Sequence, residues 1–160
     1  MVRPVPSVFL SIVIPVYNEQ ARIGETLKQV VGFLNGWDRT WEVVIADDGS
    51  TDDSALLIED FISSSSGVRL LSLQHRGKGW AVMNGMLAAL GQYRPLCDAH
   101  LSVPIAQVER LLPPQADAAD VALCPIAAPA ARRTGLPPTC HLMGRPCTIL
   151  RRSPSAPSLP

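Results

Sequence analysis

The chain has 160 residues, 47% of them hydrophobic, and its 14 basic residues balance its 14 acidic ones. This length and hydrophobicity exclude a wholly disordered chain and fit one globular domain or part of one. A net charge of zero supplies no long-range attraction to nucleic acid or anionic lipid, so no nucleic-acid partner is expected.

Three strands, each followed by a helix, are predicted over the first 90 residues. The apolar, β-branched segment 8–14 predicts a strand covered on both faces, and Pro15 is expected to end it. Apolar residues then recur at helical spacing over 21–34. A strand at 41–46, a helix at 54–63 capped by Ser50 or Asp52, a strand at 68–73 and a helix at 80–90 follow. This succession predicts an α/β fold with a doubly wound, mostly parallel sheet.

The pattern weakens after these units. Residues 93–97 should form the fourth strand, but Pro95 lacks the N–H that a central strand donates, so we expect local disorder or an altered strand. One more strand is predicted at 118–123 and a short helix at 140–150. Because alanine and proline dominate after Leu112, we expect a folded domain over 1–112 and a degenerate, partly disordered tail over 113–160.

The loops that follow the strands carry the candidate functional residues, since ligands bind at the carboxyl ends of strands in such sheets. Asp47, Asp48 and Gly49 follow the second strand. Carboxylates there can accept a hydrogen bond from a nucleobase N–H or a ribose hydroxyl, and a glycine permits a tight turn. A capped helix start with solvated acids explains the same residues equally well.

The loop after the first strand contains Pro15, Tyr17, Asn18 and Glu19. The tyrosine ring can stack on a base, and the two polar side chains can contact a ribose or a base. An ordinary loop leading into a helix is the alternative interpretation.

Two further loops favour phosphate and metal chemistry. Lys78, beside Gly79 at a helix start, can bring a cation and backbone N–H groups to a diphosphate, although a solvated lysine in a turn is the alternative. Neither a Walker loop nor a GxGxxG motif occurs, which counts against an ATPase or a dehydrogenase. Asp98 and His100 can both reach one divalent ion, and a surface histidine is the alternative.

Four segments, 11–19 (SIVIPVYNE), 43–52 (VVIADDGSTD), 75–79 (HRGKG) and 98–102 (DAHLS), together resemble family 2 inverting glycosyltransferases in order and spacing. The resemblance covers about residues 8–112 and is greatest to dolichyl- and polyprenyl-phosphate glucosyl- and mannosyltransferases. It implies a GT-A-like fold and transfer of a hexose from a UDP- or GDP-sugar, first of all UDP-glucose, to a lipid phosphate. It also implies a cytoplasmic protein with peripheral contact at the cytosolic face of a membrane.

The resemblance assigns roles to the candidate residues. It implies a nucleotide-sugar site made of Pro15, Tyr17, Asn18, Glu19, Asp47, Asp48, Gly49, Lys78, Gly79 and Asp98. Within this site, Pro15, Tyr17 and Asp48 would hold uracil or guanine. A Mn²⁺ or Mg²⁺ cofactor would be held by Asp98 and His100. Because His100 replaces an acid of the family, the site should suit Mn²⁺ better than Mg²⁺, and metal-assisted departure of the nucleotide should weaken.

Little of the family's acceptor half follows these motifs, so three hypotheses are kept. The first is the donor-binding half of a glycosyltransferase. The second is a truncated, non-catalytic remnant that at most binds a nucleotide. The third, a phosphate-binding regulatory α/β domain, predicts no preference for a base.

Overall fold

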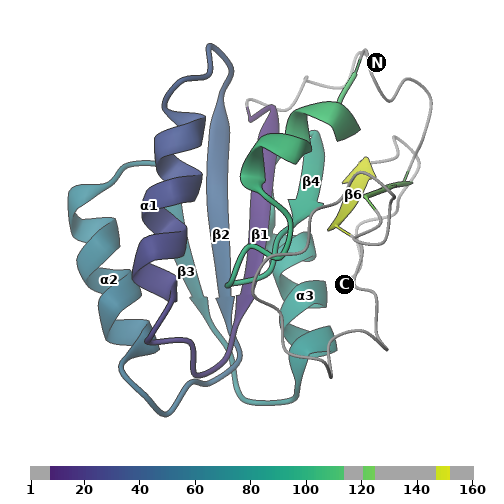
Figure 1. The fold of residues 1–160 in the computed structure, drawn as a ribbon. Coiled ribbons are helices and arrows are strands. Elements are labelled where there is room, and N and C mark those ends of the chain that lie inside the picture. The colour runs from purple at the N-terminus through teal and green to yellow at the C-terminus, as the bar shows by residue number, and fades with distance from the viewer. Residues whose placement is uncertain (1–7, 114–120, 125–146, 152–160) are drawn as a thin grey trace, which may run out of the picture.

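The computed structural model describes residues 8–113, 121–124 and 147–151, which form one mixed sheet with helices on both faces (Figure 1). Its elements in chain order are β1 (Leu10–Val16), α1 (Ile23–Leu34), β2 (Trp41–Asp47), α2 (Ser54–Ser64), β3 (Val68–Ser72), α3 (Lys78–Ala88), β4 (Tyr93–Leu96), the 3₁₀ helix η1 (Ile105–Leu111), β5 (Val121–Cys124) and β6 (Cys147–Arg151).

The sheet has the strand order β3-β2-β1-β4-β6-β5. The first four strands by sequence pair in parallel, whereas β6 is antiparallel to both β4 and β5. Parallel neighbours need long crossover connections, and α1, α2 and α3 supply them. The predicted α/β fold with a doubly wound, mostly parallel sheet is therefore confirmed.

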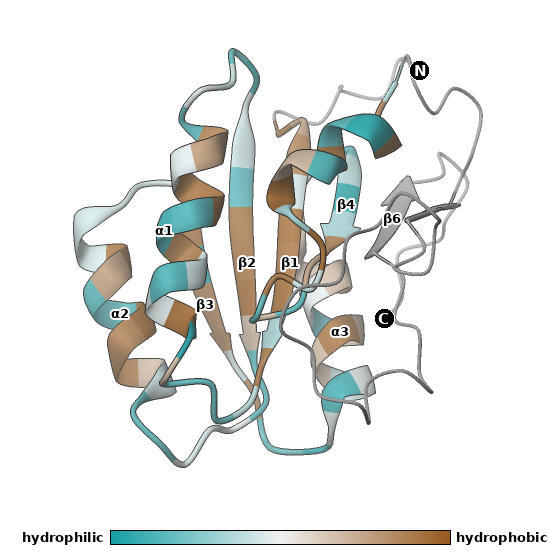
Figure 2. Ribbon diagram, in the orientation of Figure 1, coloured by the Kyte–Doolittle hydropathy of each residue, from teal (hydrophilic) through white to brown (hydrophobic). Residues whose placement is uncertain are grey.

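Two apolar layers hold the helices against the sheet. Every residue of β1 is buried, and successive side chains point to opposite faces. Ile12 and Ile14 pack in the larger layer, with residues of α1, α2 and η1, whereas Val13 packs in the smaller layer with Met86 of α3. Figure 2 shows the hydrophobic residues concentrated along β1 and β2, between the helices.

Near the amino ends of the parallel strands, the buried carboxylate of Glu42 connects several elements. Glu42 of β2 accepts hydrogen bonds from Ser11 Oγ at 2.5 Å, Arg69 Nε at 2.9 Å and the Leu90 N–H at 2.7 Å. Burial raises the pKa of Glu42, but the bonds from these three donors outweigh it and hold the pKa below its ordinary value. Glu42 thereby links β1, β3 and the segment between α3 and β4.

The missing N–H has different consequences at the two prolines of the sheet, Pro15 and Pro95. Pro15 does not end β1, contrary to the expectation. The Phe9 and Val13 carbonyls accept hydrogen bonds from the Tyr93 and Cys97 N–H groups, so every second residue of this strand turns its backbone toward β4. Pro15 is the next such residue, but it lies beyond the last residue pair of β1 and β4, where no ladder bond needs its N–H. Pro95 lies in β4 between the Tyr93 and Cys97 N–H groups that donate to β1 at 3.0 and 2.9 Å. Pro95 therefore interrupts the hydrogen-bond ladder between β4 and β1. Of the two expected alternatives, local disorder or an altered strand, the structure has the altered strand.

The expectations for the last 48 residues have mixed outcomes. The strand predicted at 118–123 is confirmed over 121–123, within β5, and residues 118–120 lie outside the described part. The helix predicted at 140–150 is wrong over 147–150, which belong to β6, and residues 140–146 lie outside the described part. The segment Cys147–Arg151 contains the β-favouring Thr148 and Ile149 and pairs with two strands, which decides against a helix. The predicted disorder of the tail otherwise falls outside the described residues.

Within the described ranges, no helix is both long and apolar enough to cross a membrane.

Candidate functional site

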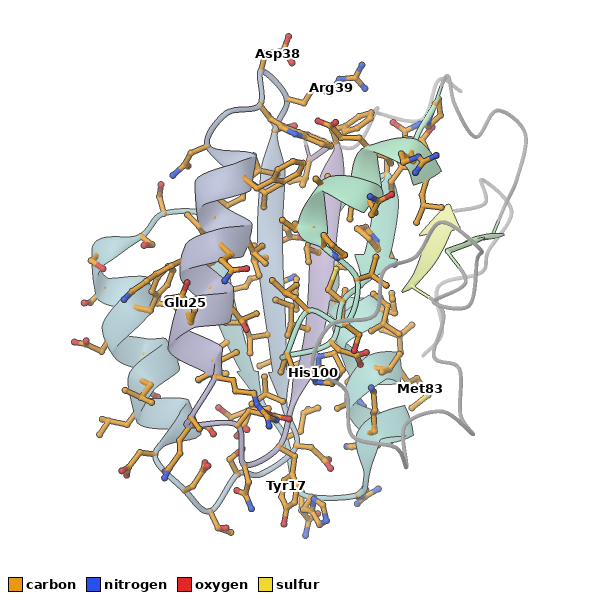
Figure 3. All side chains as sticks on the ribbon, in the orientation of Figure 1. Tyr17, Glu25, Asp38, Arg39, Met83 and His100 are labelled. Atoms are coloured by element: carbon orange, nitrogen blue, oxygen red, sulfur yellow. The ribbon has the colours of Figure 1, made fainter. Side chains whose placement is uncertain are left out.

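A pocket of about 180 Å³ lies at the carboxyl ends of the parallel strands. Seven of the residues predicted from the sequence line it: Pro15, Tyr17, Glu19, Asp48, Lys78, Asp98 and His100. They come from the ends of β1, β2 and β4 and from the start of α3. Figure 3 shows Tyr17 and His100 toward the same end of the sheet, with Asp38 and Arg39 at the opposite end.

Tyr17 forms an aromatic wall of this pocket. Its side chain is 42% exposed although it follows a fully buried strand. The ring of His75 stacks on it, with the ring centroids 4.2 Å apart. His75 therefore covers one face of the Tyr17 ring, and the rest of the ring is accessible to a ligand.

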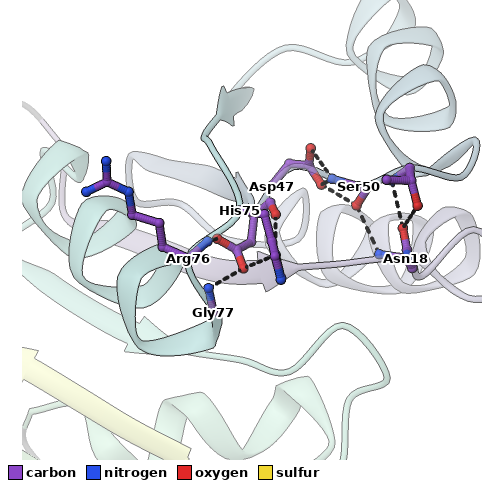
Figure 4. A network of polar contacts seen from close by, with 8 residues as sticks. Asn18, Asp47, Ser50, His75, Arg76 and Gly77 are labelled. Atoms are coloured by element: carbon purple, nitrogen blue, oxygen red, sulfur yellow. Dashed lines mark hydrogen bonds and ion pairs between the residues drawn. The ribbon is translucent and has the colours of Figure 1, made fainter.

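Asp48 organises the loop between β3 and α3. Its Oδ1 accepts a hydrogen bond from the Arg76 N–H at 3.0 Å, and its Oδ2 accepts one from the Gly77 N–H at 2.8 Å. The Nδ1 of His75 lies 2.9 Å from Oδ2 of Asp48, which is only 2% exposed (Figure 4). Two backbone N–H groups therefore compensate this buried carboxylate, as a buried charge requires, and His75 Nδ1 lies between Oδ2 and the Asp48 carbonyl oxygen, which is 3.0 Å away.

Gly49 allows the loop after β2 to lie close to the loop between β3 and α3. Its φ of 71° lies in the left-handed region, and a Cβ there would come within 2.9 Å of the backbone N of His75. Only glycine meets both conditions without strain. Gly49 shapes the site and is not among the residues that line the pocket.

Two other predicted residues also build the loops. The Oδ1 of Asn18 accepts hydrogen bonds from the N–H groups of Thr51 at 2.8 Å and Asp52 at 3.3 Å, and its own N–H donates to Ser50 Oγ at 3.0 Å (Figure 4). Asp47 accepts from the N–H and the hydroxyl of Ser50. Neither Asn18 nor Asp47 lines the pocket, and neither does Gly79.

Charged side chains face each other across the pocket from α3 and from the loop after β4. The Lys78 ammonium donates to Oδ1 of Asp98, and Ser102 Oγ lies 3.4 Å from Oδ2 of the same carboxylate. The Nε2 of His100 lies 2.6 Å from the Ser102 hydroxyl. Asp98, His100 and Lys78 thus form one connected polar group.

The predicted metal ligands do not fit a resident divalent ion in this arrangement. A metal ligand must offer a free lone pair and, for a carboxylate, its negative charge. The charge of Asp98 is already compensated by the Lys78 ammonium. Among the residues described, no three His, Cys, Asp or Glu side chains gather as a metal site would require.

His75 is the functional-site residue for which the sequence suggested no role. The sequence does place His75 at the start of the HRGKG segment. A histidine before a glycine-rich turn, however, does not indicate that its partner is Asp48, 27 positions earlier. Gly77, from the glycine-lysine-glycine turn expected near a diphosphate, also lines the pocket, and so do Val16, Ala81 and Ala99, which were not predicted.

Comparisons with known proteins identify relatives of this chain. The chain is 40% identical over 105 residues to a dolichyl-phosphate β-glucosyltransferase from Dictyostelium discoideum, which covers 61% of this chain and 32% of that protein. It is 35% identical over 112 residues to an undecaprenyl-phosphate 4-deoxy-4-formamido-L-arabinose transferase from Pseudomonas savastanoi, covering 69% of this chain and 33% of that one. The chain spans about a third of the length of these curated relatives.

A solved structure has the same fold. It is a mannosyltransferase from Pyrobaculum calidifontis in complex with GDP-Man and Mn²⁺, at 24% identity and a TM-score of 0.59, covering 77% of this chain and 37% of that one. The family model described as glycosyl transferase family 2 matches residues 11–152. Because this match spans most of the chain and the fold agrees with it, the chain belongs to glycosyl transferase family 2.

Proposed function

We propose that this chain is the donor-binding part of a glycosyltransferase that moves a hexose from a nucleotide sugar to a polyprenyl phosphate. UDP-glucose is the proposed donor and dolichyl phosphate the proposed acceptor. Membership of the family supports the reaction class, and the names of the similar dolichyl- and undecaprenyl-phosphate transferases support a lipid phosphate as acceptor.

The observation that carries the proposal is the pocket in which Tyr17, Asp48 and Lys78 meet. These side chains come from three different loops and offer an aromatic face, a carboxylate and an ammonium group. A nucleoside diphosphate presents the matching groups: a flat base, N–H donors on that base and an anionic diphosphate. We assign Tyr17 and Asp48 to the base and Lys78 to the diphosphate.

The buried carboxylate of Asp48 keeps acceptor capacity for this role. Each carboxylate oxygen has two lone pairs. Oδ1 accepts the Arg76 N–H, whereas Oδ2 already serves both Gly77 and His75. We therefore assign the base N–H to Oδ1.

In the proposed reaction, an ionised phosphate oxygen of the acceptor attacks the anomeric carbon of the hexose. The bond from that carbon to the donor's diphosphate oxygen breaks, and the nucleoside diphosphate leaves with the electron pair. An ionised phosphate needs no general base. Lys78 stabilises the negative charge that develops on the leaving diphosphate. The proposal includes no divalent cation, because Asp98 is already paired with Lys78.

A lipid-phosphate acceptor implies that the protein works at a membrane surface. We propose peripheral contact at the cytosolic face, where a nucleotide sugar and the head group of the acceptor can both reach the pocket.

A second candidate function is nucleotide binding without transfer. The observation that favours it is the Asp98, His100 and Ser102 group, in which each polar side chain is engaged with another protein side chain. Such a chain would bind the donor and leave it intact.

The proposal is tested by calorimetric titration of the purified chain with UDP-glucose, GDP-mannose and inorganic phosphate. Preferential binding of one nucleotide sugar supports the donor site and names its base. Equal, weak binding of all three favours a general phosphate-binding domain. Tyr17→Ala should weaken nucleotide binding, whereas Tyr17→Phe, which keeps the ring, should retain it.

A transfer assay then separates the two candidates. Labelled UDP-glucose is incubated with the chain and dolichyl phosphate in detergent, and label in the lipid phase is counted. Labelled lipid supports the transferase, and binding without labelled lipid supports the second candidate.

A further inference from the structure

The Lys78–Asp98 ion pair puts a positive charge at the point where the sequence predicted a metal ion. Lys78 is the first residue of α3, and Asp98 follows β4. The two side chains are 37% and 14% exposed and both line the pocket, so the pair is accessible to a ligand there.

Helix stability does not explain a lysine at this position. Cations are unfavourable near the N-terminus of a helix because of the helix dipole. Asp98 offsets that penalty in the structure described here, and a bound anion would offset it as well. A lysine in this place is therefore suited to a negatively charged ligand.

The other half of the predicted metal site carries no negative charge. His100 is held by the Ser102 hydroxyl at 2.6 Å, and a neutral imidazole leaves the Lys78, Asp98 and His100 group without net charge. An acid at position 100 would leave one net negative charge there. Attraction of this group for a divalent cation is therefore lower than it would be with an acid at position 100.

Among the described residues that line the pocket, Lys78 is the one lysine or arginine. The carboxylates of Glu19, Asp48 and Asp98 line the same pocket. The Lys78 ammonium carries three donors on a flexible stem, so it can keep one donor on Asp98 and turn the others to phosphate oxygens without any backbone movement. Lysine is a regular phosphate ligand that acts as a point charge.

We propose that this chain holds the diphosphate of its nucleotide through Lys78 in place of a divalent cation, so that nucleotide binding needs no Mn²⁺ or Mg²⁺. This inference rests on the proposed donor site. It differs from the expectation for a metal at Asp98 and His100, because it assigns the neutralising charge to a side chain.

The test is calorimetric titration of the purified chain with UDP and with GDP, first in EDTA and then in MnCl₂. We expect the preferred nucleotide to bind with dissociation constants that agree within about threefold between the two conditions. Binding in MnCl₂ that is lost in EDTA would overturn the inference and leave the proposed donor site standing. Absence of binding in both conditions would overturn the inference and the donor site together.

Variants of the two lysines of the chain give a matched comparison. Lys78→Met should weaken binding in EDTA by about tenfold or more, and Lys78→Arg should retain most of it because the charge remains. Lys28→Met, at an exposed position on α1, should leave binding unchanged. Equal affinity of Lys78→Met and the unaltered chain, with folding checked by circular dichroism, would refute the assignment.

His100→Asp provides the reverse test. Restoring an acid should create a site for Mn²⁺, seen in electron paramagnetic resonance as a loss of the free-ion signal beyond the loss that UDP alone causes. Nucleotide binding should then become stronger in MnCl₂ than in EDTA. A loss beyond that of UDP alone already with the unaltered chain would overturn the inference.

Discussion

The imidazole of His75 stacks on the ring of Tyr17, with ring centroids 4.2 Å apart and planes inclined by 21°, and its Nδ1 lies 2.9 Å from Oδ2 of Asp48. A base inserted between the two rings would need about twice that separation. The face of Tyr17 that can receive a base is therefore the one opposite His75, and His75 sets the position of both proposed base contacts.

His75→Ala should weaken UDP binding by about threefold to tenfold, because Tyr17 loses its stacking partner and Asp48 loses one of its hydrogen bonds. His75→Phe, which keeps the stacking, should weaken it less. Calorimetric titration of the three proteins checks this order. Affinity that rises on removal of the imidazole would mean that His75 obstructs the base.

Asn18→Ala should lower the free energy of unfolding by about 1 kcal/mol, because the Thr51 and Asp52 N–H groups lose a shared acceptor. The φ of 52° at Asn18 adds strain for an alanine. Urea denaturation measures the loss. Asn35→Ala, at the exposed end of α1 with a φ of −63°, is the matched control and should be near neutral. A large loss of UDP affinity with unchanged stability would instead place Asn18 at the ligand.

Local sequence patterns were enough to predict β1 to β4, α1 to α3 and the end of the sheet at which the site lies. Period-2 and period-3.6 spacing is a local property, and the loops after parallel strands meet by topology. Seven candidate residues consequently line one pocket.

Features that depend on partners distant in sequence were not predictable in the same way. β6 forms because residues 147–151 find β4, more than 50 positions earlier, and nothing in Cys147–Arg151 specifies that partner. His75 acquires its role from Asp48, and Asn18 turns its amide toward Thr51 rather than toward the pocket. Residue type alone left the direction of these side chains open.

Glu42 should make stability depend on pH. Its pKa in the folded protein is below the ordinary value of 4.5, so its ionised form contributes stability that is fully present above that value. This contribution is lost as the pH falls through the folded-state pKa. Glu42→Gln should lower the free energy of unfolding at pH 7 by about 2 kcal/mol, since a charged acceptor of three hydrogen bonds becomes neutral.

Urea denaturation of Glu42→Gln and the unaltered chain between pH 7 and pH 3 checks this pH dependence. The difference in unfolding free energy should shrink once the pH falls below about 4.5, toward the folded-state pKa. Glu59→Gln, at an exposed position of α2, is the control and should follow the unaltered chain. A difference that stays constant down to pH 3 would contradict the assigned role.

Gly85 lets α3 pack tightly against β1 and β2. A Cβ at this position would lie 2.5 Å from Cγ1 of Val13 and 3.3 Å from Cβ of Ala46. Both neighbours are fully buried in strands, so neither can move aside freely. Gly85→Ala should therefore lower the free energy of unfolding by about 2 kcal/mol through overpacking, although alanine favours helix.

Gly32→Ala is the matched control for that substitution. Gly32 lies on the exposed side of α1, where an added Cβ would meet nothing within 4 Å, so the same change should stabilise the protein by up to about 1 kcal/mol. Urea denaturation of both variants gives opposite signs if the contact with Val13 governs the outcome. Stabilisation by both would show that α3 can shift away from β1. UDP titration of Gly85→Ala then measures how strongly the pocket depends on the position of α3, because the same helix begins at Lys78.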